Sequence, residues 1–315
     1  MVSLLVFHTA CQETNFPSSS KTTPTADWGI LFPDTANDTG HDTGQLDNAV
    51  VVPRQSAVGF GNALICGTQY CWASAPFGPN AELYAIDIQA QRTAILPTGT
   101  GQSLSLLNEI VVLSGPEGLY LADGLFDGLG QTGVISCGEA KCASVLKSGL
   151  WIDEPITEHR PKAIVHHQDQ WVWQNENGQI EKSSGEISEW SGPEIQSMSV
   201  IDNSVWVGSP HEGCAHRLNI ETLELNESWC NGLLSFAYSI SVIAENEIFI
   251  GAPSALGGKG YVGFWKDGAE IWKSEGRTLG EGFGSALQYH RDKILVGAPS
   301  ASGGQGLIYM VEWDE

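Results

Sequence analysis

Six of the seven cysteines in this 315-residue chain are spaced so that pairs of them would meet across a hairpin. Two pairs share the pattern C-G-x-x-x-C, and the third pair flanks the segment 215–229, which has the pattern of two strands and a turn. A short hairpin places its flanking residues side by side, at a separation compatible with a disulfide. We therefore expect three disulfides: Cys66–Cys71, Cys137–Cys142 and Cys214–Cys230.

Zinc binding is the alternative use of these cysteines, because loop thiolates are common zinc ligands. The C-x4-C spacing is less typical of a zinc site than C-x2-C, and an exported protein favours disulfides. Mass spectrometry without reduction separates the two hypotheses, since free thiols or other pairings would refute the disulfide assignment.

The histidine and carboxylate side chains form no recognisable catalytic pattern. His166, His167 and Asp169 belong to a polar turn between two strands, and neighbouring strand residues point to opposite faces, so we interpret them as a solvated turn. The acidic residues are scattered, and no pair of carboxylates for hydrolysis stands out. The GGxG stretches at 257–260 and 303–306 lack the Lys-Ser/Thr and the helix of a phosphate-binding loop, and we expect turns there.

The charge of the chain is strongly negative, since 37 acidic and 15 basic residues give a formal charge of −22. Sequence-independent binding to DNA or RNA needs Lys and Arg, and anionic membrane surfaces attract basic proteins. The composition therefore excludes nucleic acid as a partner. Residues 1–50 carry six acidic residues and one basic residue, or −5, which leaves −17 on the remainder. The acidity belongs mainly to residues 51–315 and favours a neutral or basic ligand.

The N-terminal segment 1–11, MVSLLVFHTAC, is similar to the end of a bacterial lipoprotein signal. In such signals a short apolar run and small residues precede a cysteine that becomes the lipidated first residue of the mature protein. Cys11 would then account for the odd cysteine count. His8 departs from the usual leucine, and the Lys or Arg that normally precedes the apolar run is missing. We expect lipidation of Cys11 and location in a bacterial cell envelope, at the outer membrane or cell surface.

The segment 12–47 is rich in Ser, Thr, Pro, Asp and Gly and predicts a disordered tether, because it has too little apolar surface to offset its ordering entropy. The chain is thus divided into a signal segment (1–11), a flexible polar linker (12–47) and a folded domain (48–315). No run approaches the roughly 18 apolar residues of a membrane-spanning helix. We therefore expect contact with the membrane through a lipid anchor only.

From residue 58 onward the sequence repeats itself seven times, with a period of about 37 residues. The clearest copies are Phe236–Gly268 and Phe283–Trp313, in which a strand ending in Gly-Ala-Pro precedes a glycine-rich loop and another strand. Weaker copies begin at Phe60, Ser103, Val134, Lys162 and Ser197. Alternating apolar and polar residues indicate strands with one buried face, and continuous apolar runs indicate inner strands covered on both faces.

Four short antiparallel strands in each of seven copies predict an all-β fold, a seven-bladed β-propeller of four-stranded antiparallel blades. One such sheet cannot bury both faces alone, so the sheets must stack around a central channel. The seventh copy ends after its third strand. We expect the segment Ala49–Pro53 to supply the missing strand, so that an N-terminal strand closes the ring.

The last copy, FGSAL followed by ILVGAPSASGGQGLIYMV, resembles the FG-GAP repeat, which builds the seven-bladed propeller of integrin α chains and occurs in many bacterial envelope proteins. The best matches to the two halves of the motif are Phe283-Gly284 with Gly297-Ala298-Pro299, Phe236 with Gly251-Ala252-Pro253, and Phe60-Gly61 with Ser74-Ala75-Pro76. Copies two to five keep only fragments. The resemblance implies a binding or adhesion scaffold with no chemistry of its own.

Calcium is the ion that the resemblance implies, bound by a loop of Asp-x-Asp-x-Asp-Gly type between the first and second strands. Here those loops read YHRDK, IAENE, VIDNS and HHQDQ, and none has three carboxylates at alternate positions. We therefore expect no calcium and no other cofactor. In copies one and three we expect the disulfides Cys66–Cys71 and Cys137–Cys142 to pin the equivalent loops where relatives use calcium.

We expect a monomeric, non-enzymatic scaffold that binds a protein or a glycan. In a propeller, the loops between second and third strands share one face with the loops between blades. We therefore place the ligand at Phe77, Asn80, Ser254, Gly257, Lys259, Glu281, Ser300, Gly303 and Gln305. Two alternatives stay open. One is a propeller hydrolase or lyase acting on envelope or extracellular polysaccharide, which needs carboxylates and histidines converging at the channel. The other is a purely structural envelope component.

Overall fold

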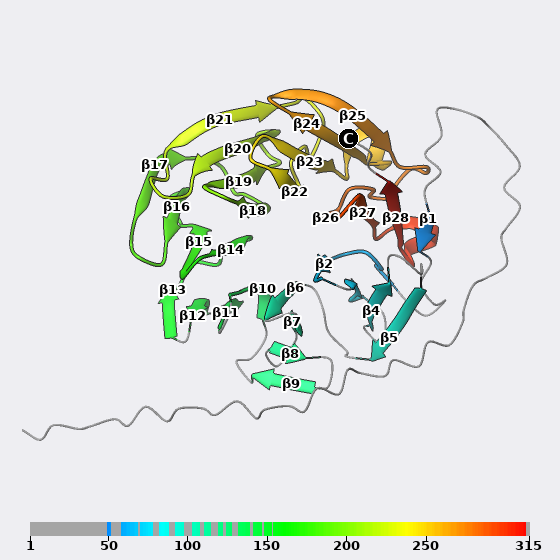
Figure 1. Cartoon of the computed structure of the whole chain (residues 1–315), viewed down its shortest axis with the longest axis horizontal. Helices are drawn as coiled ribbons and strands as arrows, with labels where there is room; N and C mark the ends of the chain where they lie inside the picture. The colour runs from blue at the N-terminus through cyan, green and yellow to red at the C-terminus, as the bar shows by residue number, and fades with distance from the viewer. Residues whose placement is uncertain are drawn as a thin grey trace, which may run out of the picture.

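A computed structural model gives the fold, and it describes residues 49–51, 58–68, 70–77, 82–87, 92–97, 103–107, 110–114, 119–121, 124–127, 132–138, 141–146, 148–152 and 154–312. The strands of these residues form seven antiparallel four-stranded sheets arranged in a ring (Figure 1). The predicted signal segment with Cys11 and the predicted linker 12–47 lie outside the described residues. An all-β propeller of four-stranded antiparallel blades, as expected from the repeats, is confirmed.

We number the sheets as blades in chain order and give their strands from the innermost outward. Blades 1 to 3 consist of β2 (Leu64–Cys66), β3 (Cys71–Ala75), β4 (Glu82–Asp87) and β5 (Arg92–Pro97); β6 (Leu104–Leu107), β7 (Ile110–Ser114), β8 (Leu119–Leu121) and β9 (Gly124–Asp127); and β10 (Thr132–Cys137), β11 (Cys142–Leu146), β12 (Gly149–Ile152) and β13 (Glu154–Thr157). Each blade follows chain order, because tight connections join neighbouring antiparallel strands.

Blades 4 to 6 have the same plan. They consist of β14 (Ile164–His167), β15 (Gln170–Gln174), β16 (Gln179–Lys182) and β17 (Ile187–Ser191); β18 (Ser197–Ile201), β19 (Ser204–Ser209), β20 (Cys214–Asn219) and β21 (Leu225–Cys230); and β22 (Ser239–Ala244), β23 (Glu247–Ala252), β24 (Tyr261–Lys266) and β25 (Ala269–Glu275). The second strands carry the continuous apolar runs. β19 is buried along its whole length, as expected for a strand covered on both faces.

Blade 7 joins the two ends of the described chain (Figure 1). It consists of β26 (Ala286–His290), β27 (Lys293–Ala298), β28 (Leu307–Glu312) and β1 (Ala49–Val51). β1 runs antiparallel to β28, with Ala49 opposite Met310 and Val51 opposite Ile308. The predicted closure of the ring by an N-terminal strand is therefore confirmed, and within the described residues that strand covers Ala49–Val51.

The two GGxG stretches lie between second and third strands, as predicted, but each forms a helical turn instead of a simple loop. These turns are α1 (Ala255–Gly258) in blade 6 and α2 (Ala301–Gly304) in blade 7. Left-handed backbone angles lie inside each turn, with φ of 73° at both Gly257 and Gly303. Glycine adopts this conformation without steric cost, which explains its place in both stretches.

Consecutive blades meet through a phenylalanine at the start of the later blade. Phe60, Phe236 and Phe283 precede the first strands of blades 1, 6 and 7, and all three are fully buried or nearly so. Phe60 and Phe283 also pair with the end of the glycine-rich stretch of the preceding blade, through Gly306 and Gly260 respectively. These phenylalanines belong to the first half of the repeated motif. Their burial at the blade boundaries explains why the motif recurs once per blade.

Most of the core lies between blades, because each cluster of buried apolar residues combines two neighbouring blades. Trp173 and Trp206 are fully buried, and the Trp206 ring centre lies 4.5 Å from that of Trp229 in the same blade. Trp173, Trp206 and Trp229 are therefore packing residues. No helix among the described residues has the length and the apolar character needed to cross a membrane.

Candidate functional site: the mouth of the central channel

A cavity of about 730 Å³ opens at one end of the ring. Adjacent strands alternate in direction, so the connections between second and third strands and those between consecutive blades lie on one face, which we call the loop face. The opposite face carries the turns between first and second strands, and we call it the turn face. The cavity is lined by the residues that begin the innermost strand of every blade, so it lies on the loop face, where the ligand was predicted.

The lining of this channel mouth is polar but almost uncharged. Hydroxyl and amide side chains come from Asn62, Ser103, Gln196, Ser197, Tyr238, Ser239, Ser285 and Ser300. Lys162 is the one charged side chain among the described residues of the lining, although the chain as a whole carries −22. The mouth therefore contrasts with the acidity of the rest of the protein.

Two of these hydroxyls already donate a hydrogen bond toward the next blade. Ser239 Oγ donates to the Gly284 carbonyl oxygen at 2.7 Å, and Ser197 Oγ donates to the Ala237 carbonyl oxygen at 3.2 Å. A hydroxyl that has donated its proton keeps acceptor capacity. These serines therefore offer a ligand acceptors held in fixed positions.

Exposed apolar side chains lie on the loop face along blades 6, 7 and 1. Of the eleven large hydrophobic residues exposed in the described part of the chain, six lie in loop-face connections, and we call them the apolar rim: Val58, Phe77, Leu234, Tyr238, Leu256 and Leu279. Leu279 is 72% exposed, Leu234 70% and Phe77 56%. Single exposed leucines need no explanation, but apolar residues gathered on one face mark interaction sites.

Two cations stand beside the apolar rim in blade 6 and in its connection to blade 7. Lys259 follows α1, and Arg277 follows β25. Among the described residues, neither side chain forms an ion pair with a carboxylate within 4.0 Å. The guanidinium carbon of Arg277 lies 5.5 Å from the ring centre of Tyr309, in a cation–π contact. This part of the loop face is thus suited to a ligand that brings a negative charge.

The predicted ligand-binding residues fall into four groups, the last of which is Glu281 alone. Phe77, Ser254, Gly257, Ser300 and Gly303 are exposed on the loop face, and Phe77 and Ser300 also line the mouth. Lys259 and Gln305 are partly exposed there. Asn80 lies outside the described residues.

Glu281 requires a correction, because its side chain is only 1% exposed. Its carboxylate accepts hydrogen bonds from the Thr278 backbone N–H (2.9 Å), from Thr278 Oγ1 (3.1 Å) and from the Tyr309 hydroxyl. A ligand on the loop face does not reach this carboxylate. The glycines on both sides suggested an exposed loop tip, but the loop folds back, so Glu281 orders the connection between blades 6 and 7.

The structure contains the three predicted disulfides. In each pair the cysteines stand directly opposite each other in neighbouring strands, which is the arrangement that the hairpin argument required. Cys66–Cys71 and Cys137–Cys142 close turns on the turn face. Cys214–Cys230 joins β20 to β21 at their loop-face ends. Three disulfides are typical of an oxidising, exported environment.

Two groups of metal-ligating side chains occur among the described residues. One is Cys66 with Cys71 and His290, and the other is Glu212 with Cys214 and His216. His290 did not stand out in the sequence, because it belongs to blade 7 and its neighbours belong to blade 1. Leu234, Tyr238, Leu256 and Leu279 did not stand out either. The sequence did place these four residues in connections on one face. It did not show that their side chains are exposed, because exposure depends on how the loops pack.

Comparison with known proteins identifies the fold. No family model matches the chain, and no curated protein matches it. The chain is similar to the WD40 β-propeller domain of Doa1, with a TM-score of 0.63 and 12% identity over 87% of this chain and 99% of that one. It is similar to the Cps50 (Swd1) β-propeller domain of Myceliophteria thermophila, with a TM-score of 0.63 and 11% identity over 84% and 99%. A computationally designed protein, Ika8, gives a TM-score of 0.55 and 15% identity over 85% and 98%. These likenesses show the β-propeller fold alone.

Proposed function

We propose that this chain is a non-enzymatic, envelope-anchored FG-GAP propeller that binds a protein or a glycan at the channel mouth. One observation carries the proposal. A cavity lined by uncharged hydroxyl and amide groups and the apolar rim beside it lie on the same face of the ring. Propellers commonly act as interaction scaffolds, and this combination indicates which face the partner would contact.

The size and chemistry of the mouth fit a binding site. Its volume of about 730 Å³ falls within the roughly 300–1,000 Å³ that is usual for ligand pockets. A protein segment would cover the apolar rim and place a carboxylate near Lys259 or Arg277. A glycan would donate its hydroxyl protons to the fixed serine acceptors and stack a sugar ring on Tyr238, which is exposed at the edge of the mouth.

The FG-GAP assignment is supported by the blade boundaries. Phe60, Phe236 and Phe283 occupy equivalent buried positions, and the glycines of the second half of the motif lie against the residue that follows each phenylalanine. The lipidation of Cys11, the signal segment and the envelope location are part of the proposal and rest on the sequence. The three disulfides support export.

The hydrolase or lyase alternative needs paired carboxylates at the channel. Among the described residues that line the mouth there is no carboxylate, so this site offers no acid–base pair for glycoside cleavage. The absence of catalytic activity stays a prediction, tested by incubating the chain with envelope polysaccharide and assaying for new reducing ends.

A capture experiment with matched variants tests the binding proposal. The rim variant carries Leu234→Ser, Leu256→Ser and Leu279→Ser. The control variant carries Ile110→Ser, Ile156→Ser and Ile271→Ser, which are also exposed but lie on the turn face or on outer strands. We expect the full chain and the control to retain the same partner from envelope extract, and the rim variant to lose it. Equal retention by all three proteins would refute the loop face as the binding site.

A glycan arm separates the two classes of ligand. The full chain is titrated with soluble envelope polysaccharide, and Tyr238→Ala is compared with Tyr70→Ala, which lies in a turn-face connection. Saturable binding that is lost in Tyr238→Ala but kept in Tyr70→Ala supports a glycan ligand. No binding by the wild-type chain, together with a protein captured through the rim, supports a protein ligand.

A further inference from the structure

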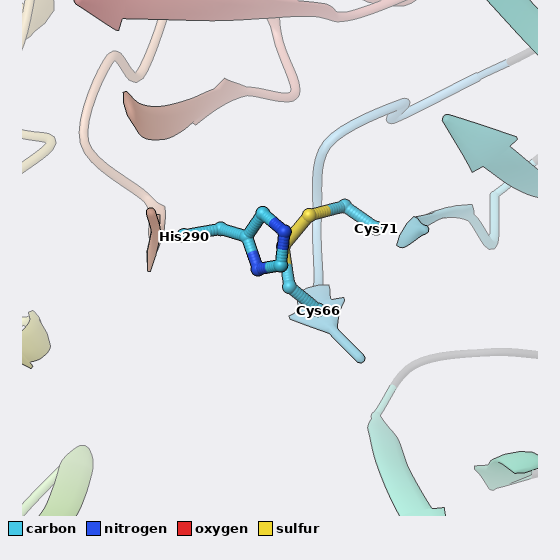
Figure 2. Close-up of side chains that lie close together, drawn as sticks. All are labelled: Cys66, Cys71 and His290. Atoms are coloured by element: carbon cyan, nitrogen blue, oxygen red, sulfur yellow. A yellow bond between two sulfur atoms is a disulfide. The ribbon is translucent and has the colours of Figure 1, made fainter. Parts of the chain in front are cut away.

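A second group of reactive side chains lies on the turn face, where blade 7 meets blade 1. Figure 2 shows the imidazole of His290, from β26, directed at the sulfur atoms of Cys66 and Cys71 in blade 1. A ring nitrogen of His290 and the two Sγ atoms all lie within 4.8 Å of one another. The site is separate from the loop face and does not depend on the function proposed there.

Two turns hold these three side chains in place. Cys66 and Cys71 stand opposite each other where β2 pairs with β3, and His290 is the last residue of β26. The next residue, Arg291, donates from Nη2 to the carbonyl oxygen of Thr68 at 2.7 Å, and Thr68 lies in the turn between the two cysteines. This hydrogen bond ties the turn of blade 7 to the turn of blade 1 and fixes His290 beside the sulfurs.

Two thiolates and one imidazole form a ligand set that suits Zn²⁺. Tetrahedral zinc has Zn–S distances of about 2.3 Å and Zn–N distances of about 2.0–2.1 Å, so its ligand atoms lie about 3.5–3.8 Å apart. The three ligand atoms already lie within 4.8 Å of one another, so small movements would bring them to those distances once the sulfurs separate. In the disulfide the two sulfurs are bonded to each other and are not available as thiolates.

We propose that Cys66, Cys71 and His290 form a zinc site that becomes available when the Cys66–Cys71 disulfide is reduced. The reductant is a dithiol, whose thiolate attacks Cys66 Sγ, because Cys66 is partly exposed whereas Cys71 is buried. The Cys66–Cys71 bond breaks, Cys71 leaves as a thiolate, and the second thiol of the reductant displaces Cys66. The products are two cysteine thiols and the disulfide of the reductant.

Zinc binding then exchanges protons for the metal. Zn²⁺ displaces the two thiol protons, which pass to solvent, and neutral His290 supplies a nitrogen lone pair. Three protein ligands leave the fourth position for water or an external ligand. The metal would join blade 1 to blade 7 at the turn face. Blade 7 is also the blade that β1 completes as its outermost strand.

The other two disulfides provide built-in comparisons. Cys137–Cys142 has the same C-G-x-x-x-C pattern and the same opposed register. His166 lies against its turn at Gly138, but among the described residues no third ligand atom lies within 4.8 Å of both of its sulfurs. His216 stands beside Cys214, but its Nδ1 contacts Ser228 Oγ at 2.8 Å and its Nε2 contacts Glu212 Oε2 at 3.0 Å. Both ring nitrogens of His216 are thus engaged. Within the described residues, the boundary of blades 7 and 1 alone places two cysteines and a histidine together.

Zinc titration of the reduced full chain tests the proposal. The chain is reduced with a phosphine, which leaves no competing dithiol, and Zn²⁺ is titrated against a chromophoric chelator. We expect the reduced wild-type chain to bind zinc at this site and the oxidised chain to bind none there. His290→Ala should weaken binding more than about 100-fold, because loss of even an outer-shell partner typically costs 10–100-fold. The double variant Cys137→Ser, Cys142→Ser should keep wild-type affinity.

Three results would overturn the proposal: unchanged affinity in His290→Ala, equal zinc binding by the oxidised chain, or loss of the near-UV circular dichroism of the wild-type chain on reduction. The last counts because the site needs a folded ring. Should His290→Ala itself fail to fold, Co²⁺ absorption of the reduced wild-type chain decides. A tetrahedral spectrum with two thiolates and a nitrogen supports the site, and an octahedral or four-thiolate spectrum refutes it.

Discussion

Gly297 of blade 7 lies against the backbone of Gly61 in blade 1, so closely that a Cβ atom on Gly297 would stand 2.0 Å from the Gly61 carbonyl oxygen. The same contact recurs between Gly251 and Gly284, where the corresponding distance is 2.3 Å. The two halves of the repeated motif therefore meet across a blade boundary, although the sequence places them in one repeat. Glycine is required because the strand of one blade touches the backbone of the next.

Gly297→Ala is expected to destabilise the chain by about 1–3 kcal/mol, the usual cost of overpacking a close contact. The matched control is Gly232→Ala, because a Cβ there would meet nothing within 4 Å. Urea unfolding followed by tryptophan fluorescence gives the free energy of unfolding of each variant. Equal unfolding midpoints for the two variants would show that the blade boundary tolerates a methyl group.

Deletion of residues 48–56 is expected to lower the melting temperature sharply. It removes β1, whose residues pair with Met310, Tyr309 and Ile308 of β28 and complete blade 7. Deletion of residues 12–40, which leaves β1 in place, is the control and should leave the melting temperature unchanged. Thermal unfolding followed by circular dichroism checks both, and equal melting temperatures for the two truncations would refute closure of the ring by β1.

Tyr309→Phe is expected to change the alkaline stability of the chain. Burial, and then the hydrogen bond to Glu281, raise the pKa of the Tyr309 hydroxyl above its ordinary value of 10.0. The unfolded chain ionises this group at lower pH than the folded chain does. Its stabilising effect is therefore complete below pH 10 and falls as the pH rises above that value.

The wild-type chain and Tyr309→Phe should accordingly differ most near neutral pH. The variant should be less stable there by about 1–3 kcal/mol, because a buried carboxylate oxygen loses its partner. The difference in free energy of unfolding should shrink above about pH 10. Urea unfolding across this range measures it, with Tyr238→Phe, an exposed tyrosine, as the control. A difference that stays constant with pH would contradict the assignment.

The three disulfides are expected to differ in their contribution to stability. Cys214–Cys230 spans 16 residues, whereas Cys66–Cys71 and Cys137–Cys142 each span five. The chain-entropy relation gives about 3 kcal/mol for the longer loop and about 2 kcal/mol for each shorter one. Paired Cys→Ser variants, unfolded in urea, should follow this order. A larger loss from either short pair would show that native contacts outweigh loop entropy here.

The sequence predicted the blades because the physics that defines them is local. Continuous apolar runs such as Ile294–Val296 marked inner strands, and the cysteine spacing marked turns whose ends had to face each other. The closing strand Ala49–Val51 was also predictable, since blade 7 lacked one strand and an unassigned strand preceded blade 1.

The site was less predictable because it depends on contacts between blades. Glu281 has the flanking glycines of a solvent-facing loop, yet its loop folds back under the Tyr309 hydroxyl. His290 and Cys66 are remote in sequence and meet because the ring brings blade 7 round to blade 1. The exposure of Leu234 and Leu279 follows from loop packing, which no local pattern encodes.

The pairing of β1 with β28 also sets an order on biosynthesis. Among the described strands, β1 is made first and its partner β28 last, so this pair can form only after the strands of blades 1 to 6 have been made. Blades 1 to 6 assemble from adjacent segments, but blade 7 requires contact between the most distant parts of the described chain, the kind of contact that slows folding. While β28 is still being made, the earlier blades would therefore form an open arc, and the ring can close only after β28 has emerged from the ribosome.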